Sequence, residues 1–143
     1  MPFGPKAAVL GVNGRNGGTV QLWDDPIGQT VALDDAEKWA LWNWSADAHP
    51  IHLYLVKLRV MSRRGIGDSF EGVELTERGW KDTVISYPGE VTTVAAKSDI
   101  AGLYVRHCHI LEHEDDEMMV PYCVEDPNNG VDDWPPELFR GRL

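Results

Sequence analysis

Five histidines lie in only two stretches of this 143-residue sequence, and both stretches have the character of a metal site. The first stretch reads HPIHLY, and the second, further along the chain, reads HCHILEHEDDEMM. The second stretch also contains a cysteine and two methionines, which are soft sulfur donors. A lone histidine is usually structural, but clustered histidines beside sulfur donors indicate transition-metal binding. The histidines are His49, His52, His107, His109 and His113.

Cys108 stands between two of these histidines, and strand alternation gives that arrangement a geometric meaning. Neighbouring side chains of a strand point to opposite faces, so His107 and His109 share one face while Cys108 points to the other. His113 and Met118 follow five and ten residues after the cysteine, on a loop that can return both to its sulfur. A thiolate, two imidazoles and a weak thioether form the blue-copper electron-transfer set.

The second imidazole of that set must come from another segment, and His49 is the natural donor. This leaves His52, His107 and His109 for a second metal nearby. Two of the three are covalent neighbours of Cys108, so a very short bonded path would join the two metals. The arrangement suits the transfer of single electrons.

Short segments rich in β-branched and aromatic residues position these ligands. Turn residues such as Asn13-Gly14 and Pro88-Gly89 separate them. Short strands at this spacing, without a long helical period, predict an antiparallel β-sandwich or barrel. We also expect single helical turns at 34–39 and 110–116. The predicted strands are 38–44, 51–60, 91–96, 103–108 and 119–124.

Composition narrows the class of protein. The chain is long enough for one domain, and 43% hydrophobic and 25% charged residues are ordinary for a globular protein. No apolar run approaches the roughly 20 residues of a membrane span. The net charge of −10 argues against nucleic acid as a partner. The segment MPFGPKAAVLGVNG lacks an apolar run of signal-peptide length, so we expect a secretory leader to be absent or already removed. The sequence does not indicate a compartment.

Three further expectations concern residues outside the clusters. Cys123 alternates with apolar neighbours and is expected to be a buried core residue. Trp42 and Trp44 fall on one side of their predicted strand and are expected in the core. Residues 1–125 are predicted to form the domain, with 126–143 as a polar extension along its surface.

The two metal-ligand stretches closely resemble the C-terminal cupredoxin domain of bacterial multicopper oxidases, the laccase and bilirubin oxidase group. The resemblance is carried by HPIHL, by the specific HCH-x3-H-x4-M pattern, and by DAHPIHL, LVKLRVMSR, ERGWKDTV and PGEVTTV. It covers roughly residues 10 to 125. It implies a single all-β, cupredoxin-like Greek-key β-sandwich that binds copper and acts as an oxidoreductase with electron transfer.

The resemblance also implies a role for each ligand. His49, Cys108, His113 and Met118 would bind the type 1 copper, which takes electrons from the substrate. The remaining three histidines would bind the type 2 copper (His52) and the type 3 pair (His107 and His109), where dioxygen is reduced to water. Glu114 matches an acidic position linked to proton supply. The alternative is that Glu114 is simply one carboxylate of an acidic loop.

Two departures from the family pattern limit what the chain does alone. The family motif is H-P-x-H-x-H, and its third histidine is replaced here by Tyr54. A phenol with a pKa near ~10 is a poor ligand, so we favour a Tyr54 that fills the space and donates a hydrogen bond over one that binds metal. The family's trinuclear cluster also needs eight histidines, half of them from two H-x-H motifs of another domain. A second cupredoxin domain, or another subunit of a homo-oligomer, would have to supply them.

Three functions therefore remain open. The first is an oxidase domain that, within an assembly, oxidises phenolic, aromatic or metal-ion reductants with dioxygen. The second is a stand-alone blue-copper module for electron transfer or copper binding. The third is a degenerate, truncated copy without oxidase activity. The four preserved type 1 ligands argue against the third.

Overall fold

The computed structural model describes residues 8–14, 17–69 and 72–128, and most of these residues lie in β-strands. Ten strands, one α-helical turn and one 3-10 turn are formed within these ranges. The strands are β1 (Leu10–Gly14), β2 (Gly17–Gln21), β3 (Thr30–Ala32), β4 (Ala36–Trp42), β5 (His49–Leu53), β6 (Leu58–Gly65), β7 (Thr83–Ser86), β8 (Glu90–Lys97), β9 (Gly102–Cys108) and β10 (Met119–Glu125). The helical turns are η1 (Leu75–Glu77) and α1 (Leu111–Glu114). No helix in the described ranges is long and apolar enough to cross a membrane.

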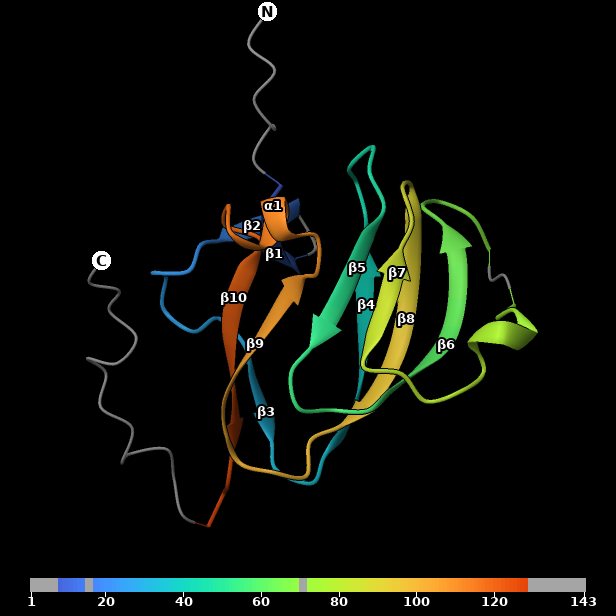
Figure 1. Cartoon of the computed structure of the whole chain (residues 1–143). Helices are drawn as coiled ribbons and strands as arrows, with labels where there is room; N and C mark the ends of the chain where they lie inside the picture. The colour runs from blue at the N-terminus through green and yellow to red at the C-terminus, as the bar shows by residue number, and fades with distance from the viewer. Residues whose placement is uncertain (1–7, 15–16, 70–71, 129–143) are drawn as a thin grey trace, which may run out of the picture.

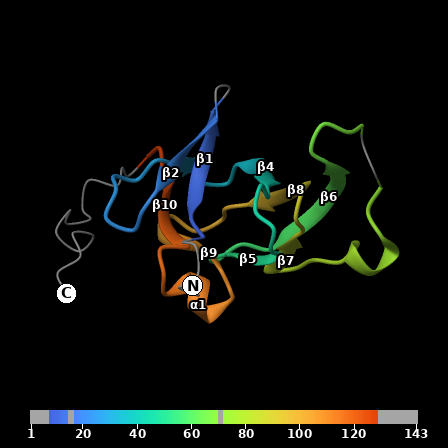
Figure 2. The ribbon, with the colours of Figure 1, turned by 90° about the horizontal axis from the view of Figure 1, so that it is seen from above.

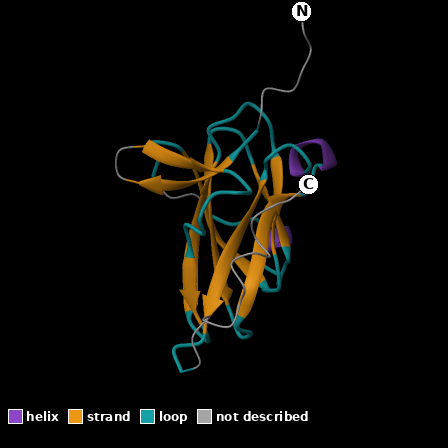
Figure 3. Cartoon of the chain, turned by 90° about the vertical axis from the view of Figure 1, so that its left-hand side faces the viewer, coloured by secondary structure: helices purple, strands orange, loops and turns teal. Residues whose placement is uncertain are grey.

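Two sheets make up the body of the molecule (Figure 1). One has five strands in the order β3-β10-β9-β5-β7, and the other has three in the order β4-β8-β6. All pairs are antiparallel except β3 with β10. Strands that are distant in sequence lie side by side, as the Greek-key arrangement requires. The hairpin β1–β2 forms a sheet of its own and projects from the sandwich (Figure 3).

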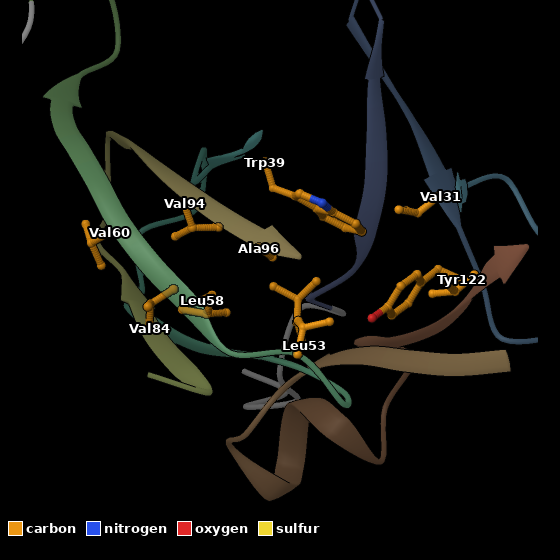
Figure 4. Close-up of a cluster of buried hydrophobic side chains, with 11 residues drawn as sticks. Val31, Trp39, Leu53, Leu58, Val60, Val84, Val94, Ala96 and Tyr122 are labelled. Carbon is orange, nitrogen blue, oxygen red and sulfur yellow. The ribbon is translucent and has the colours of Figure 1, made fainter. Parts of the chain in front are cut away.

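The core lies between these sheets and is filled by large apolar side chains (Figure 4). Leu53 of β5 and Val94 of β8 enter this core from opposite sheets, and Trp39 stands edge-on to Tyr122 at 5.5 Å between ring centroids. Burying each such side chain contributes about 1.5–3 kcal/mol relative to leaving it exposed. Cys123 is also buried, in agreement with the sequence expectation.

The predicted strands are present, with one division and with one strand that ends early, at Trp42 and not at residue 44. The single strand expected at 51–60 is two strands, β5 and β6, which belong to different sheets. A turn at Tyr54–Leu55 separates them, and Leu55 has φ of 57°, in the left-handed region. The apolar run continues through this turn, so hydrophobic pattern alone does not reveal the break.

The two expected helical turns have different outcomes. The turn at 110–116 is present as α1. The turn expected at 34–39 is wrong, because Asp34 takes a positive φ of 68° and the chain then enters β4 at Ala36. Strand pairing of β4 with β8 overrides the local helical preference of this segment.

The fold brings two segments that are distant in sequence to one end of the five-stranded sheet. β9 ends and β5 begins beside α1, which caps this end in Figures 1 and 2. The antiparallel register pairs Ile51 with Cys108 and His52 with His107. Residues from the two clusters of the sequence are therefore neighbours across the sheet.

Candidate metal centre

Three donor side chains converge at this end of the sheet. His49 is the first residue of β5, Cys108 is the last of β9, and His113 lies in α1. The Cys108 Sγ atom is 3.6 Å from His49 Nδ1 and 3.8 Å from His113 Nδ1. Ligand atoms of the three residues all lie within 4.8 Å of one another. One metal ion between them would contact all three.

Backbone hydrogen bonds hold the loop that returns His113 to the cysteine. The amide of Met118 donates to the carbonyl of His113 at 2.9 Å, and the amide of Cys108 donates to the carbonyl of Met118 at 3.0 Å. Glu117, with φ of 70°, makes the turn between them. The Met118 side chain is buried in one apolar cluster with Cys108 and Ile51. All four residues expected to form the first site are thus gathered at one place.

The surroundings of this site favour neutral side chains while no cation is bound. Burial lowers the pKa of His49, the nearby His113 lowers it further, and Asp47 opposes both. Burial raises the pKa of the Cys108 thiol, as does Glu114, whereas a hydrogen bond from the Ile110 backbone lowers it. Metal binding requires the thiolate, so the thiol proton must leave when a metal ion enters.

The remaining three histidines gather on the opposite face of the same strands. Ring centroids are 5.3 Å apart for His52 and His107, 5.3 Å for His107 and His109, and 6.1 Å for His52 and His109. The Nδ1 atom of His52 contacts the Asp82 carbonyl at 3.0 Å and the Thr83 hydroxyl at 3.1 Å. Its Nε2 atom is therefore the nitrogen left for a ligand. The strand alternation expected around Cys108 is confirmed.

Glu114 is the last residue of α1, and its side chain lies beside this second group of histidines. One carboxylate oxygen, Oε2, is 3.4 Å from His107 Nδ1 and 3.8 Å from His109 Nδ1. The same oxygen is buried and has no hydrogen-bond partner among the described residues. A buried carboxylate oxygen in this state can accept a proton or a water molecule.

Tyr54 lies beside the same histidines, at the position where the sequence motif lacks its third histidine. Its ring stands edge-on to His52 with 4.9 Å between centroids, and is 6.3 Å from the ring of His107. The side chain is about half exposed, and nothing in the described part of the chain accepts a hydrogen bond from its hydroxyl. Its backbone carbonyl accepts a hydrogen bond from the buried Tyr122 hydroxyl. Tyr54 therefore fills the space, but its hydroxyl does not make the expected hydrogen bond to any residue that the structure describes.

One expectation near the site is wrong. Trp44 is 70% exposed and lies beyond the end of β4, where the chain has left the sheet. It stacks on Trp42 at 5.7 Å between centroids, and Arg64 lies over the Trp42 ring. Neither tryptophan belongs to the main core cluster. The strand ends two residues earlier than its apolar pattern indicates.

The sequence did not reveal the two residues that support the His49 ring on the side away from Cys108. The Ser45 hydroxyl lies 2.7 Å from His49 Nε2, and the buried Asn43 side chain contacts Ser45. Short polar residues in a loop carry no distinctive spacing. Only the position of NWS a few residues before a candidate ligand could have drawn attention to them.

Comparison with known proteins found a matching family model and several relatives. The family model described as multicopper oxidase matches residues 5–128. A laccase from Bacillus subtilis is 42% identical over 120 residues, which is 74% of this chain and 23% of the laccase. A bilirubin oxidase from Albifimbria verrucaria is 37% identical over 99 residues, 64% of this chain and 16% of that protein.

Solved structures show the same fold. A multicopper oxidase from Pediococcus acidilactici superposes with a TM-score of 0.71 at 28% identity, covering 80% of this chain and 25% of the other. One from Campylobacter jejuni, described as a metallo-oxidase, gives a TM-score of 0.65 at 32% identity, covering 71% of this chain and 21% of the other. The chain spans about a quarter or less of the length of these proteins.

The β-sandwich with its cysteine and histidines at one end defines a cupredoxin-like domain. With the family match over most of its length, the chain belongs to the multicopper oxidase family. The family implies copper as the metal. The donor set fits copper, because a thiolate and two imidazoles suit this ion better than they suit hard cations such as magnesium or calcium.

Proposed function

We propose that this chain is the electron-accepting domain of a multicopper oxidase and that it holds a type 1 copper. His49, Cys108 and His113 would hold the copper in this proposal, and Met118 would add a weaker thioether ligand. The observation that supports it is the convergence of the three donor atoms within 4.8 Å. Copper at this position would supply one-electron redox chemistry.

The chain's own residues prepare the site for that chemistry. Nδ1 of His49 and Nδ1 of His113 both face the Cys108 sulfur, so the two nitrogen atoms and the sulfur converge on one point. Ile51 and Met118 pack against Cys108 and keep water away from its sulfur. Such a water-poor, preformed pocket limits rearrangement when the metal changes charge.

The same strand gives electrons a route out of the site. Cys108 is covalently bonded to His107 and His109, whose side chains lie on the opposite face with His52. We assign these three histidines to part of a trinuclear copper cluster. Glu114, close to two of them, is the residue that would supply protons there.

The cluster is incomplete within this chain, so the proposal requires a partner. Among the five histidines of the sequence, three remain after the type 1 site, and Tyr54 stands where a fourth is expected. A second cupredoxin domain or another copy of the chain would supply H-x-H ligands. The electrons would come from a small phenolic or aromatic molecule or a metal ion.

Tyr54 also favours a second candidate, a stand-alone blue-copper electron-transfer or copper-binding module. The phenol replaces an imidazole beside His52, which weakens the second site but leaves the first intact. This function needs only the type 1 ligands. It predicts about one copper per chain whatever the oligomeric state.

Copper content and solution mass, measured on the same sample, test both candidates. The purified chain should bind Cu(II) and turn intensely blue, as His₂Cys sites do. One copper per monomer supports the stand-alone blue-copper module. A higher ratio that appears only in an oligomer supports the shared trinuclear cluster. A colourless Cu(II) protein contradicts both.

A further inference from the structure

A chain of polar groups contacts the His49 ring on the side away from Cys108. It runs from the end of β4 to the start of β5. The Ser45 hydroxyl contacts His49 Nε2 at 2.7 Å. It also lies 2.7 Å from the Asn43 side-chain oxygen Oδ1 and 3.1 Å from the Asp47 carbonyl. These contacts sit in a loop whose residues are otherwise exposed, while Asn43 and His49 are buried.

The orientation of the Asn43 amide follows from its neighbours. Its Nδ2 group donates to the Asp47 carbonyl at 2.7 Å and to the Ser86 carbonyl at 2.9 Å. Both neighbours are pure acceptors, so the NH₂ group must face them. The oxygen Oδ1 therefore faces Ser45, where it accepts from the Ser45 backbone amide at 2.9 Å.

This orientation of Asn43 determines whether the Ser45 hydroxyl donates its hydrogen bond to His49 or to the neighbouring oxygens. A serine hydroxyl has one proton to donate. Donating it to His49 would leave the hydroxyl oxygen facing Asn43 Oδ1 at 2.7 Å and the Asp47 carbonyl at 3.1 Å with no proton on either line. Oxygen lone pairs at such distances repel. The proton is therefore donated toward these oxygens, and Ser45 Oγ accepts a hydrogen bond from His49.

We propose that Asn43 and Ser45 are positioning residues that fix His49 as the tautomer with its proton on Nε2. This tautomer presents a bare Nδ1 lone pair toward Cys108 Sγ, 3.6 Å away. A histidine that binds a metal ordinarily donates its other N–H to such an acceptor, which sets the ring angle and the tautomer. The inference deepens the proposed function and rests on it for its consequence in copper binding. The tautomer itself does not depend on copper.

The same contacts hold the His49 ring in place on the side away from Cys108. Ser45 Oγ also accepts from the Asp47 amide at 3.3 Å, so one side chain ties the loop to the histidine ring. Ser45 touches neither Cys108 nor His113 in any hydrogen bond of the described residues. Its effect on the metal site therefore passes through His49 alone.

Ser45→Ala and Ser45→Thr form the test pair, because threonine keeps the hydroxyl that alanine removes. Long-range ¹H–¹⁵N NMR on the metal-free protein reads which nitrogen of His49 carries the proton. We expect Nε2–H in the wild type and in Ser45→Thr, and a mixture of tautomers in Ser45→Ala. Thr83→Val is the matched control, because it removes a hydroxyl contact of similar length from His52 and should leave His49 unchanged.

Copper affinity provides the second readout. Ser45→Ala should bind Cu(II) about 10- to 100-fold more weakly, the usual effect of losing such an outer hydrogen bond, and Ser45→Thr should restore affinity. A His49 proton on Nδ1 in the wild type overturns the inference. Unchanged tautomer and affinity in Ser45→Ala also overturn it, even if its melting temperature falls. Wild-type protein with the Nε2–H tautomer but no copper binding instead contradicts the proposed function and leaves the tautomer assignment intact.

Should Ser45→Ala fail to fold, the wild-type tautomer and the comparison of Ser45→Thr with Thr83→Val still decide the question. Nδ1–H in the wild type refutes the inference without any variant. Equal copper affinity in wild type and Ser45→Thr with the Nε2–H tautomer supports it.

Discussion

The two buried cysteines allow a matched pair of substitutions that separates metal binding from packing. Both Cys108 and Cys123 are free and buried, at 0% and 6% exposure. Only the Cys108 sulfur lies within 4 Å of histidine nitrogens. We therefore expect Cys108→Ser and Cys123→Ser to have similar effects on stability, but only Cys108→Ser to weaken copper binding.

The expected magnitudes follow from these environments. A serine hydroxyl buried with an imperfect partner costs about 1–3 kcal/mol of unfolding free energy. For a domain of this size that corresponds to a melting temperature lower by roughly 4–12 °C. Cys108→Ser also replaces a thiolate by a neutral hydroxyl. Copper affinity should fall by at least about 100-fold, since losing only an outer hydrogen bond already costs 10- to 100-fold.

Chelator-competition titration gives the copper affinity, and urea unfolding of the metal-free variants gives the stability. Cys123→Ser should bind copper within about twofold of the wild type and keep the blue colour. Equal losses of copper affinity in both variants would refute the reasoning. So would a blue, tightly bound copper in Cys108→Ser.

Two further predictions concern pH and a buried ion pair. Burial lowers the pKa of His49, so as the pH falls this histidine is protonated in the unfolded chain before it is protonated in the folded one. The stability of the metal-free protein should therefore be constant above about pH 6.5 and fall below it. His49→Gln should flatten this part of a urea-unfolding pH series, and an unchanged slope would exclude His49 as its source. Arg63, which is buried, donates two hydrogen bonds to Glu77 at 2.8 and 2.6 Å and so lowers the Glu77 pKa. Glu77→Gln should cost about 2 kcal/mol at pH 7, with the difference from wild type lost as pH falls below about 4 and Glu77 is protonated. A pH-independent difference would show that the cost is not electrostatic.

Much of the site could be predicted from the sequence because its ligands lie on strands and on one short loop. The two-residue period of a strand places Cys108 and His107 on opposite faces, and the structure agrees. The return of His113 to the cysteine depends on a loop of only a few residues. Local geometry therefore determines the position of most ligands of the first metal site. Pairing of β5 with β9 supplies the rest by joining the two clusters.

What could not be predicted depends on long-range packing and on backbone conformation. The apolar run from Ile51 continues through a turn at Leu55, whose left-handed φ has no signal in that run. Trp44 is exposed because β4 ends before it, a boundary that pairing with β8 sets. The contact of Ser45 with His49 depends on the orientation of the Asn43 amide, which the nearby Asp47 carbonyl and the Ser86 carbonyl, distant in sequence, determine.

X-ray absorption at the copper edge, on protein loaded with one equivalent of Cu(II), tests the central claim most directly. The claim is that the first copper binds at His49, Cys108 and His113. The spectrum should show one short copper–sulfur bond with two nitrogen ligands, and the sulfur shell should disappear in Cys108→Ser. A first shell of nitrogen and oxygen alone, in a protein that is fully loaded, would contradict it.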